Sequence, residues 1–155
     1  MEIREATAGD VSVLVGLRSA FIEELSYLGP PSSCAKSPNP LSSQLADRFR
    51  AWLPARIASG RFVGLIGFEG ADPVSTAFLV VSDRPPTPTI PNGRLATLVN
   101  VYTCPGHRRR GFGRQMVEAA LAKARNLGLD AVELEATPDG RQVYERLGFN
   151  PRPHP

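Results

Sequence analysis

The sequence predicts a single-domain α/β fold with a mixed central sheet of about five to six strands and helices on its faces. Three observations support this prediction. Strand-like apolar runs crowd the middle of the chain, an amphipathic helix covers residues 111–127, and another strand-like run follows at residues 131–136. Because a strand reached through a helix pairs in parallel, the sheet is mixed. The 155 residues are 42% hydrophobic, which suffices for one core, so we expect one domain over residues 1–155.

The N-terminal segment predicts a strand and a helix. Residues 2–6 alternate as a strand, and Thr7 or Asp10 can cap the helix that follows. Gly29-Pro30-Pro31 ends that helix, and residues 30–41 are too rich in proline and serine for regular structure.

A second helix and a hairpin come next. Apolar residues at helical spacing predict the helix over residues 42–59, with a kink or break at Pro54. Two β-rich runs at residues 61–68 and 73–81 flank Glu69-Gly70-Ala71-Asp72, which predicts a tight antiparallel turn. We expect both runs to be central strands.

The longest strand candidate is residues 94–103, reached through a proline-rich connection at residues 83–92. Gly128 is a natural stop for the helix over residues 111–127. In the run that follows, alternation predicts one inward and one outward set, respectively Val132, Leu134 and Ala136, and Glu133 and Glu135.

The last predicted helix opens with Thr137 as N-cap and Pro138 at its first position, runs to Leu147 and ends at Gly148. The expected order is therefore strand, two helices, three strands, helix, strand and helix.

The net charge of +3 is small, but basic residues gather in one segment. This segment contains His107, Arg108, Arg109, Arg110 and Arg114. Nucleic-acid-binding proteins more often spread basic residues along a face, so a local cluster favours a discrete phosphate ligand. Residues 1–30 carry five acids and two bases, which could attract a cationic acceptor, although a solvated helix face explains the same bias.

Several function classes are excluded. No run approaches the roughly 20 apolar residues of a membrane span, and no secretory signal is visible, so we expect a cytoplasmic protein with no membrane association. Cys34 and Cys104 lie 70 positions apart without CxxC spacing, which predicts two free thiols and no metal site. A covalent role for Cys104 would need an activating His and Asn, and neither is evident.

Gly111 and Gly113 stand where the strand at residues 94–103 leads into a helix. Glycines let the backbone turn sharply and approach a ligand, while the first N–H groups of the helix can hold a phosphate or pyrophosphate. The segment matches neither GxxxxGK[ST] nor GxGxxG, so it is neither a P-loop nor a dinucleotide fingerprint. A glycine-rich turn with solvated arginines would show the same pattern.

Two motifs in this order resemble one family. Arg108-x-x-Gly111-x-Gly113 resembles the (Q/R)xxGx(G/A) motif of the GCN5-related N-acetyltransferase (GNAT) family, and Tyr144-Glu145-Arg146-Leu147-Gly148-Phe149 resembles its Y-E-x-L-G-F signature. The opening Ile3-Arg4-Glu5-Ala6-Thr7-x-x-Asp10 also resembles the start of many members. The resemblance covers nearly the whole chain and implies a GNAT-like fold.

The resemblance implies acetyl-CoA as cosubstrate, in a cleft where the strands ending near Thr103 and Ala136 separate. A neutral amine of a small molecule or peptide attacks the thioester, a main-chain N–H stabilises the oxyanion, and Tyr144 occupies the usual general-acid position. A ring packed under the helix is the alternative for Tyr144. The implied cofactor contacts map onto Val101, Tyr102 and Thr103 for pantetheine, and onto Arg108, Arg109, Arg110, Gly111, Phe112, Gly113 and Arg114 for pyrophosphate.

The chain departs from the family at three places. Thr137 replaces an asparagine that contacts pantetheine in many members, so it can bind the ligand or cap the helix. Asn100 stands where some members carry a glutamate base, which leaves Glu23, Glu24, Asp83 or an ordered water as the base. The proline-rich end after Phe149 leaves no room for a closing hairpin, so the sheet ends early, or loops or a homodimer partner cover its edge.

Two alternatives to the enzyme stay open. The unidentified base and the truncated C-terminal strand region would also fit a catalytically weak CoA-binding or regulatory domain. Nucleic-acid binding through Arg108 to Arg110 is the other alternative, and its salt dependence would distinguish it.

Overall fold

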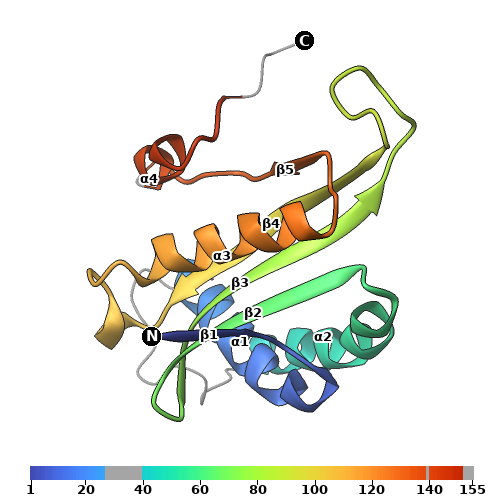
Figure 1. Cartoon of the computed structure of the whole chain (residues 1–155). Coiled ribbons are helices and arrows are strands. Elements are labelled where there is room, and N and C mark those ends of the chain that lie inside the picture. Colours follow the sequence, from blue (N-terminus) through green and yellow to red (C-terminus); the bar gives the residue numbers. More distant parts are fainter. Residues whose placement is uncertain (27–39, 139, 152–155) are drawn as a thin grey trace.

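The computed structural model describes residues 1–26, 40–138 and 140–151, and its five strands form one mixed sheet (Figure 1). The elements are β1 (Glu2–Glu5), α1 (Val11–Ser26), α2 (Pro40–Ser59), β2 (Phe62–Glu69), β3 (Asp72–Asp83), β4 (Arg94–Thr103), α3 (Phe112–Asn126), β5 (Ala131–Glu133) and α4 (Arg141–Arg146). Short 3-10 turns at Ala8–Asp10 and Pro105–His107 precede α1 and α3. The predicted order of elements and the α/β class are confirmed.

The strand order in the sheet is the order in the chain, β1-β2-β3-β4-β5. The first four strands are antiparallel, and β5 pairs in parallel with β4 after the crossover through α3. The hairpin between β2 and β3 closes at the pair Glu69–Asp72, as predicted. β3 has 12 residues and β4 has 10, so the expectation that β4 is the longest strand is wrong.

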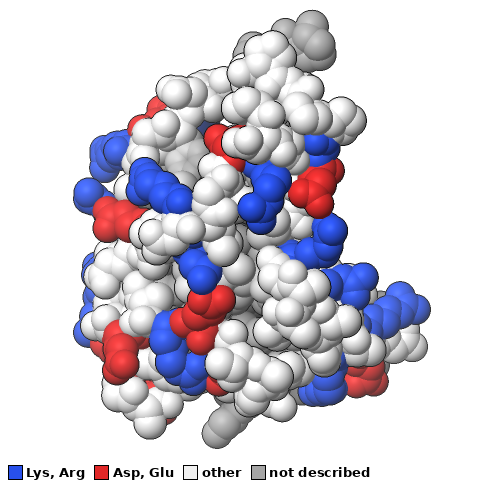
Figure 2. Space-filling model, turned by 45° about the vertical axis from the view of Figure 1, so that its right-hand side comes forward, with Lys and Arg blue, Asp and Glu red and all other residues white. Residues whose placement is uncertain are grey.

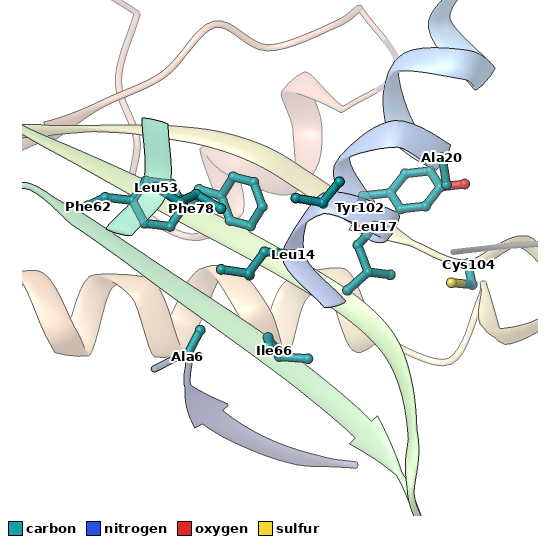
Figure 3. Packing of buried hydrophobic residues seen from close by; sticks show 11 residues of the cluster. Ala6, Leu14, Leu17, Ala20, Leu53, Phe62, Ile66, Phe78, Tyr102 and Cys104 are labelled. Carbon is teal, nitrogen blue, oxygen red and sulfur yellow. The ribbon is translucent and has the colours of Figure 1, made fainter. Parts of the chain in front are cut away.

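Helices cover both faces of the sheet. On one face α1 and α2 pack on β2, β3 and β4 around Leu14, Leu53 and Phe78 (Figure 3). On the other face the predicted stripe of α3 is buried, with Met116, Val117, Ala120 and Ala124 against β2, β3 and β4. Figure 1 shows β5 and α4 at the far end from α1 and α2.

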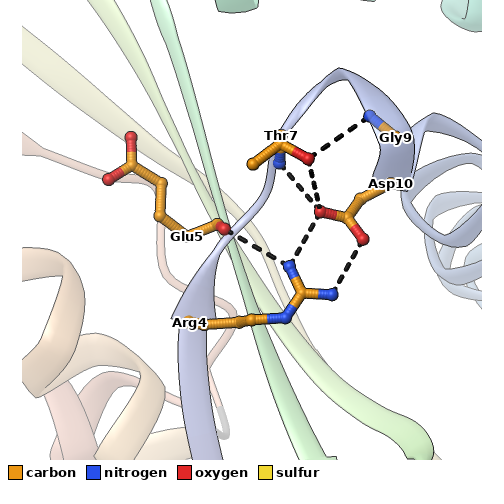
Figure 4. Close-up of polar contacts among 5 residues, drawn as sticks. All are labelled: Arg4, Glu5, Thr7, Gly9 and Asp10. Carbon is orange, nitrogen blue, oxygen red and sulfur yellow. Dashed lines mark hydrogen bonds and ion pairs between the residues drawn. The ribbon is translucent and has the colours of Figure 1, made fainter.

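A polar cluster fixes the connection from β1 into α1 (Figure 4). Asp10 accepts two hydrogen bonds from the Arg4 guanidinium, at 2.8 and 2.9 Å, and one from the Thr7 backbone N–H at 2.8 Å. Thr7 accepts in turn from the Gly9 N–H, which completes a capping box. The hydrogen bond from Arg4 holds the pKa of Asp10 far below its usual range. Both predicted capping residues therefore act together.

Two predicted helix boundaries differ from the structure. α2 continues through Pro54, so of the predicted kink or break the break does not occur. Phe49, Leu53 and Ile57 anchor the helical turns around exposed Pro54 on the core. α4 begins at Arg141 rather than at Thr137. The Thr137 hydroxyl accepts the Gly140 N–H at 3.2 Å, so it caps a turn that precedes the helix. The predicted stop at Gly29-Pro30-Pro31 and the following loop through residue 39 lie outside the described residues.

The expectation of free thiols is wrong for Cys104, which is disulfide-bonded. Nothing in the linear spacing of the cysteines indicated this, because a disulfide depends on proximity in the fold. Cys34 lies outside the described residues.

Candidate active site

The site begins where β4 and β5 separate. Their ladder has three pairs, from Leu95–Ala131 to Thr97–Glu133. Beyond Thr97, residues 98–103 of β4 have no strand on that side among the described residues. Six residues at about 3.3 Å each leave an open edge roughly 20 Å long. A linear ligand with amide groups can pair with such an edge.

A bulge distorts β4 on this open stretch. The register with β3 shifts between Thr76 and Phe78, so two β4 residues, Asn100 and Val101, stand where the regular ladder has one. Asn100 adopts a φ of 55°, which is uncommon for a residue other than glycine. It is 4% exposed, and the side-chain Nδ2 has no hydrogen-bond partner in the described chain. The bulge locally disrupts the ladder, so backbone groups of Asn100 and Val101 are free of the regular pairing with β3.

The gap opens into a cleft of about 930 Å³. One wall comes from α1, α2 and the β2–β3 face, with the side chains of Arg18, Phe21, Phe49, Trp52, Phe62, Phe78 and Val80. β4 contributes residues 97–101 as the floor. The opposite wall comes from β5, α4 and the segment between them, with Glu133, Leu134, Glu135, Thr137, Gly140 and Tyr144.

The first wall, which we call the α1–α2 wall, consists mainly of aromatic side chains and contains one cation, Arg18. Phe62 lies with its ring centroid 5.0 Å from that of Phe78, and Trp52 lies 5.7 Å from Phe62. The Arg18 guanidinium lies 5.2 Å from the Phe49 ring centroid and donates to Asn100 Oδ1 at 3.1 Å. Burial lowers the pKa of Arg18.

The second wall, which we call the β5–α4 wall, carries Tyr144. Its ring packs edge-on against Phe149 at 5.8 Å, and burial raises the pKa of its phenol, so the group stays protonated near neutral pH. Glu133 and Glu135 line the cleft, while Val132 and Leu134 pack against the core as predicted. Ala136, which was expected to point inward, is exposed, because the segment leaves the ladder after Glu133. Glu133 pairs with Arg84 at 2.6 Å, whereas Glu135 is exposed and has no ion-pair partner in the described parts of the chain.

The glycine motif lies beyond the end of β4. Gly111 is the N-cap residue of α3 with a φ of 79°, and no side chain caps this helix. A Cβ atom placed on Gly111 or Gly113 would meet no atom of the described residues within 4 Å, so no side chain or neighbouring segment among them crowds these two glycines. The free N–H groups at the start of α3 can therefore hold an anion.

The basic residues of this loop are largely paired. Arg108 forms two hydrogen bonds with Glu24 on α1, at 2.7 and 2.5 Å, and donates to the Thr103 carbonyl. Arg110 and His107 share Glu69, and Arg114 pairs with Glu118. Figure 2 shows basic and acidic side chains interspersed on the face that it presents. An anion here would meet backbone N–H groups, and it would meet Arg108, Arg110 and Arg114 already paired with carboxylates.

The structure brings three predicted site residues, Val101, Thr137 and Tyr144, into one cleft. Thr103 and the loop from Arg108 to Arg114 continue along the same end of β4, outside that lining. The Tyr102 side chain does not line the cleft but packs in the core under α1, with its ring centroid 5.7 Å from that of Phe21. Its hydroxyl has no hydrogen-bond partner among the described residues, and burial raises its pKa. Only its backbone can reach a ligand on the open edge.

The suggested bases lie elsewhere. Glu23, Glu24 and Asp83 do not line the cleft. The hydrogen bond from Arg108 lowers the pKa of Glu24, which makes it a weak proton acceptor. Asp83 ends β3 and is exposed beside Arg61.

Sequence reasoning missed Arg18 as a site residue. Its signal was present, because Arg18 shares a helical face with Leu14 and Phe21 at spacings of four and three. A charged residue in an apolar stripe indicates either a buried ion pair or a ligand.

Residues 1–26, 40–138 and 140–151 contain no group of three or more His, Cys, Asp and Glu residues that could hold a metal ion. No helix in this part of the chain is long and apolar enough to cross a membrane.

Comparisons with known proteins agree with this geometry. The model of the acetyltransferase (GNAT) family matches residues 21–149. A GCN5-related N-acetyltransferase from Ralstonia eutropha JMP134 is 28% identical with a TM-score of 0.79, covering 99% of this chain and 94% of that one. A predicted acetyltransferase with acetyl-CoA from Clostridium acetobutylicum is 25% identical with a TM-score of 0.77, covering 97% and 90%. A putative acetyltransferase from Agrobacterium tumefaciens, 23% identical with a TM-score of 0.66 and coverage of 100% and 96%, shares the fold. No curated protein matches the chain in sequence.

Proposed function

Because the chain belongs to the acetyltransferase (GNAT) family, we propose that it is an acetyl-CoA-dependent N-acetyltransferase acting on a primary amine of a small molecule or peptide. The observation that carries this proposal is the open edge of β4 over residues 98–103, which leads from the free N–H groups of α3 to a cleft containing Tyr144.

The chain's groups fit the ligand in three parts. The N–H groups after Gly111 have no side-chain cap among the described residues and suit a pyrophosphate, with Arg109 and Arg114 beside them in the sequence. The β4 edge offers backbone groups to the amides of pantetheine. In this proposal the thioester lies beside the bulge at Asn100 and Val101, whose main-chain N–H groups are the candidates for binding its oxygen.

In the proposed reaction the amine nitrogen bonds to the thioester carbonyl carbon, and the carbon–sulfur bond breaks. A bulge N–H stabilises the oxyanion, and Tyr144 donates its phenolic proton to the departing thiolate. The raised pKa of Tyr144 keeps that proton available. Glu135, the cleft carboxylate without an ion-pair partner among the described residues, accepts the proton that the attacking amine loses.

Two measurements test the function. Calorimetry with acetyl-CoA measures binding, and a turnover assay with a panel of primary amines measures transfer. We expect binding together with turnover of at least one amine. Binding without turnover of any amine would favour the CoA-binding regulatory domain instead.

A further inference from the structure

Among the described residues that line the cleft, Arg18 is the only positively charged one. In the described parts of the chain, each carboxylate that forms an ion pair does so with a base other than Arg18. Arg18 therefore has no acidic partner there. A half-buried guanidinium without an anion carries a desolvation cost, and a ligand that supplies the anion offsets it.

Hydrogen-bond donors at this point outnumber acceptors. Arg18 has five N–H donors and uses one in the bond to Asn100 Oδ1. The amide nitrogen of Asn100 adds two more donors, which are buried and find no acceptor in the described residues. A carboxylate offers two oxygens and about four lone pairs, which matches this surplus.

The surroundings of Arg18 are apolar. Phe49 lies under the guanidinium, and Phe62, Phe78 and Trp52 continue the surface along the same wall. Glu135 lies on the opposite wall of the cleft. One wall thus offers a cation among aromatic rings, and the other offers an anion.

We propose that the acceptor is an amino-acid-like molecule whose carboxylate binds Arg18 and Asn100, whose amine faces the β5–α4 wall, and whose apolar or aromatic body packs on Phe49, Phe62 and Phe78. This inference rests on the proposed function and specifies its acceptor. Arg18 is then the residue that selects carboxylate-bearing amines.

The test compares three amines that share a phenyl ring, L-phenylalanine, L-phenylalaninamide and 2-phenylethylamine, in the wild type and in Arg18→Gln. We expect the wild type to prefer L-phenylalanine in kcat/KM. Because a hydrogen bond to a charged group contributes about 1.5–3 kcal/mol, Arg18→Gln reduces kcat/KM for L-phenylalanine by roughly 10- to 100-fold, mainly through KM. Turnover of 2-phenylethylamine changes little, and Arg18→Lys restores part of the preference.

Arg56→Gln is the matched control. Arg56 lies on α2 with its guanidinium 4.4 Å from the Trp52 ring centroid and donates to the Trp52 carbonyl, but it does not line the cleft. Its replacement subtracts the same charge from α2, the helix that carries Phe49 and Trp52, and leaves the preference intact. Equal loss in both variants would overturn the proposal, since the effect would then be a general one.

A binding assay keeps this test separate from the function. In thermal melts, N-acetyl-L-phenylalanine raises the Tm of the wild type more than its amide does, and Arg18→Gln abolishes the difference. This result supports the carboxylate subsite even if no amine turns over. Equal shifts for acid and amide in the wild type would refute it, even if acetyl-CoA binds and amines are acetylated. A dependence on Arg18 seen with succinyl-CoA but not with L-phenylalanine would also overturn it, because the carboxylate would then belong to the acyl donor.

Discussion

The two walls of the cleft are anchored in different ways. Leu14, Leu53 and Phe78 behind the α1–α2 wall are 0%, 0% and 1% exposed, so this wall is part of the core. The β5–α4 wall joins the sheet through three ladder pairs, every β5 residue is only half-buried, and α4 has no buried residue. Truncation of a core side chain on the first wall, such as Phe78, therefore changes folding and binding together. On the second wall, chemistry can change while the fold remains.

Tyr144→Phe sharpens this contrast most. Loss of a general acid lowers kcat by about 10²- to 10⁴-fold. The ring stays packed on Phe149, so the melting temperature and acetyl-CoA affinity stay close to those of the wild type. Steady-state kinetics, calorimetry and thermal melts measure the three quantities. Val143→Ala, at an exposed position of α4, serves as the control with unchanged kcat. If Tyr144→Phe retains full turnover across pH, its acid role is wrong.

Phe78→Ala and Phe149→Ala test the two walls as a pair. Phe78 packs on both Phe49 and Phe62, and truncation of a fully buried phenylalanine costs about 3–5 kcal/mol of unfolding free energy. Phe149 is half-buried against Tyr144, so its truncation costs less stability and acts mainly on kcat. Urea titrations measure the free energies. Equal destabilisation by both would contradict the contrast between the walls.

Gly111→Val tests the cofactor end, where neither wall contributes. A β-branched residue at a φ of 79° is strained by about 1–3 kcal/mol, although its Cβ meets no neighbour. We expect weaker acetyl-CoA binding in calorimetry, because the loop must shift before α3. Gly106→Val also enters open space, but its φ lies outside the left-handed region, and it leaves the affinity nearly unchanged. An unaltered affinity in Gly111→Val would mean that the pyrophosphate lies elsewhere.

Asp10→Ala gives the smallest effect and loosens the first wall at the base of α1. Loss of a helix cap costs about 0.5–2 kcal/mol at neutral pH. Because the folded-state pKa of Asp10 is depressed, its contribution is complete above the unfolded pKa of about 3.9 and declines as the pH falls below it. Denaturant melts should therefore show the gap between wild type and variant narrowing in acid. Asp47→Ala, at a pair whose carboxylate is 78% exposed, shows no comparable gap.

Local patterns predicted most of the fold. Periodicity located β4 and α3, and turn chemistry located the β2–β3 hairpin, because neighbouring residues decide these features. The boundaries of β5 and α4 were less accurate, since the strand leaves the ladder at Glu133 for a reason that lies in the packing of the sheet. Packing also explains why α2 continues through Pro54, since Phe49, Leu53 and Ile57 hold the helix on the core.

The sequence motif assigned candidate residues at the cofactor end of the site, but it did not identify those at the acceptor end. The cofactor residues could be assigned from the sequence motif, because the resemblance implies backbone contacts at fixed positions. Their roles stay predictions. The acceptor residues could not be assigned in this way, since Arg18, Phe49 and Phe78 come from α1, α2 and β3 and meet only in the folded chain. The pairing of Glu24 with Arg108, across 84 positions, likewise has no local signal.

The open edge of β4 also allows ligand binding to be measured through the exchange of its backbone amide protons. In a strand with a neighbour on one side only, alternate amides point to the unpaired side, and over residues 98–103 these have no β5 partner among the described residues. Deuterium replaces such amide protons quickly, and a ligand that pairs with the edge slows the exchange there while β2 and β3 keep their rates. Mass spectrometry of peptides from β4 can therefore register cofactor binding directly, before any acceptor is known.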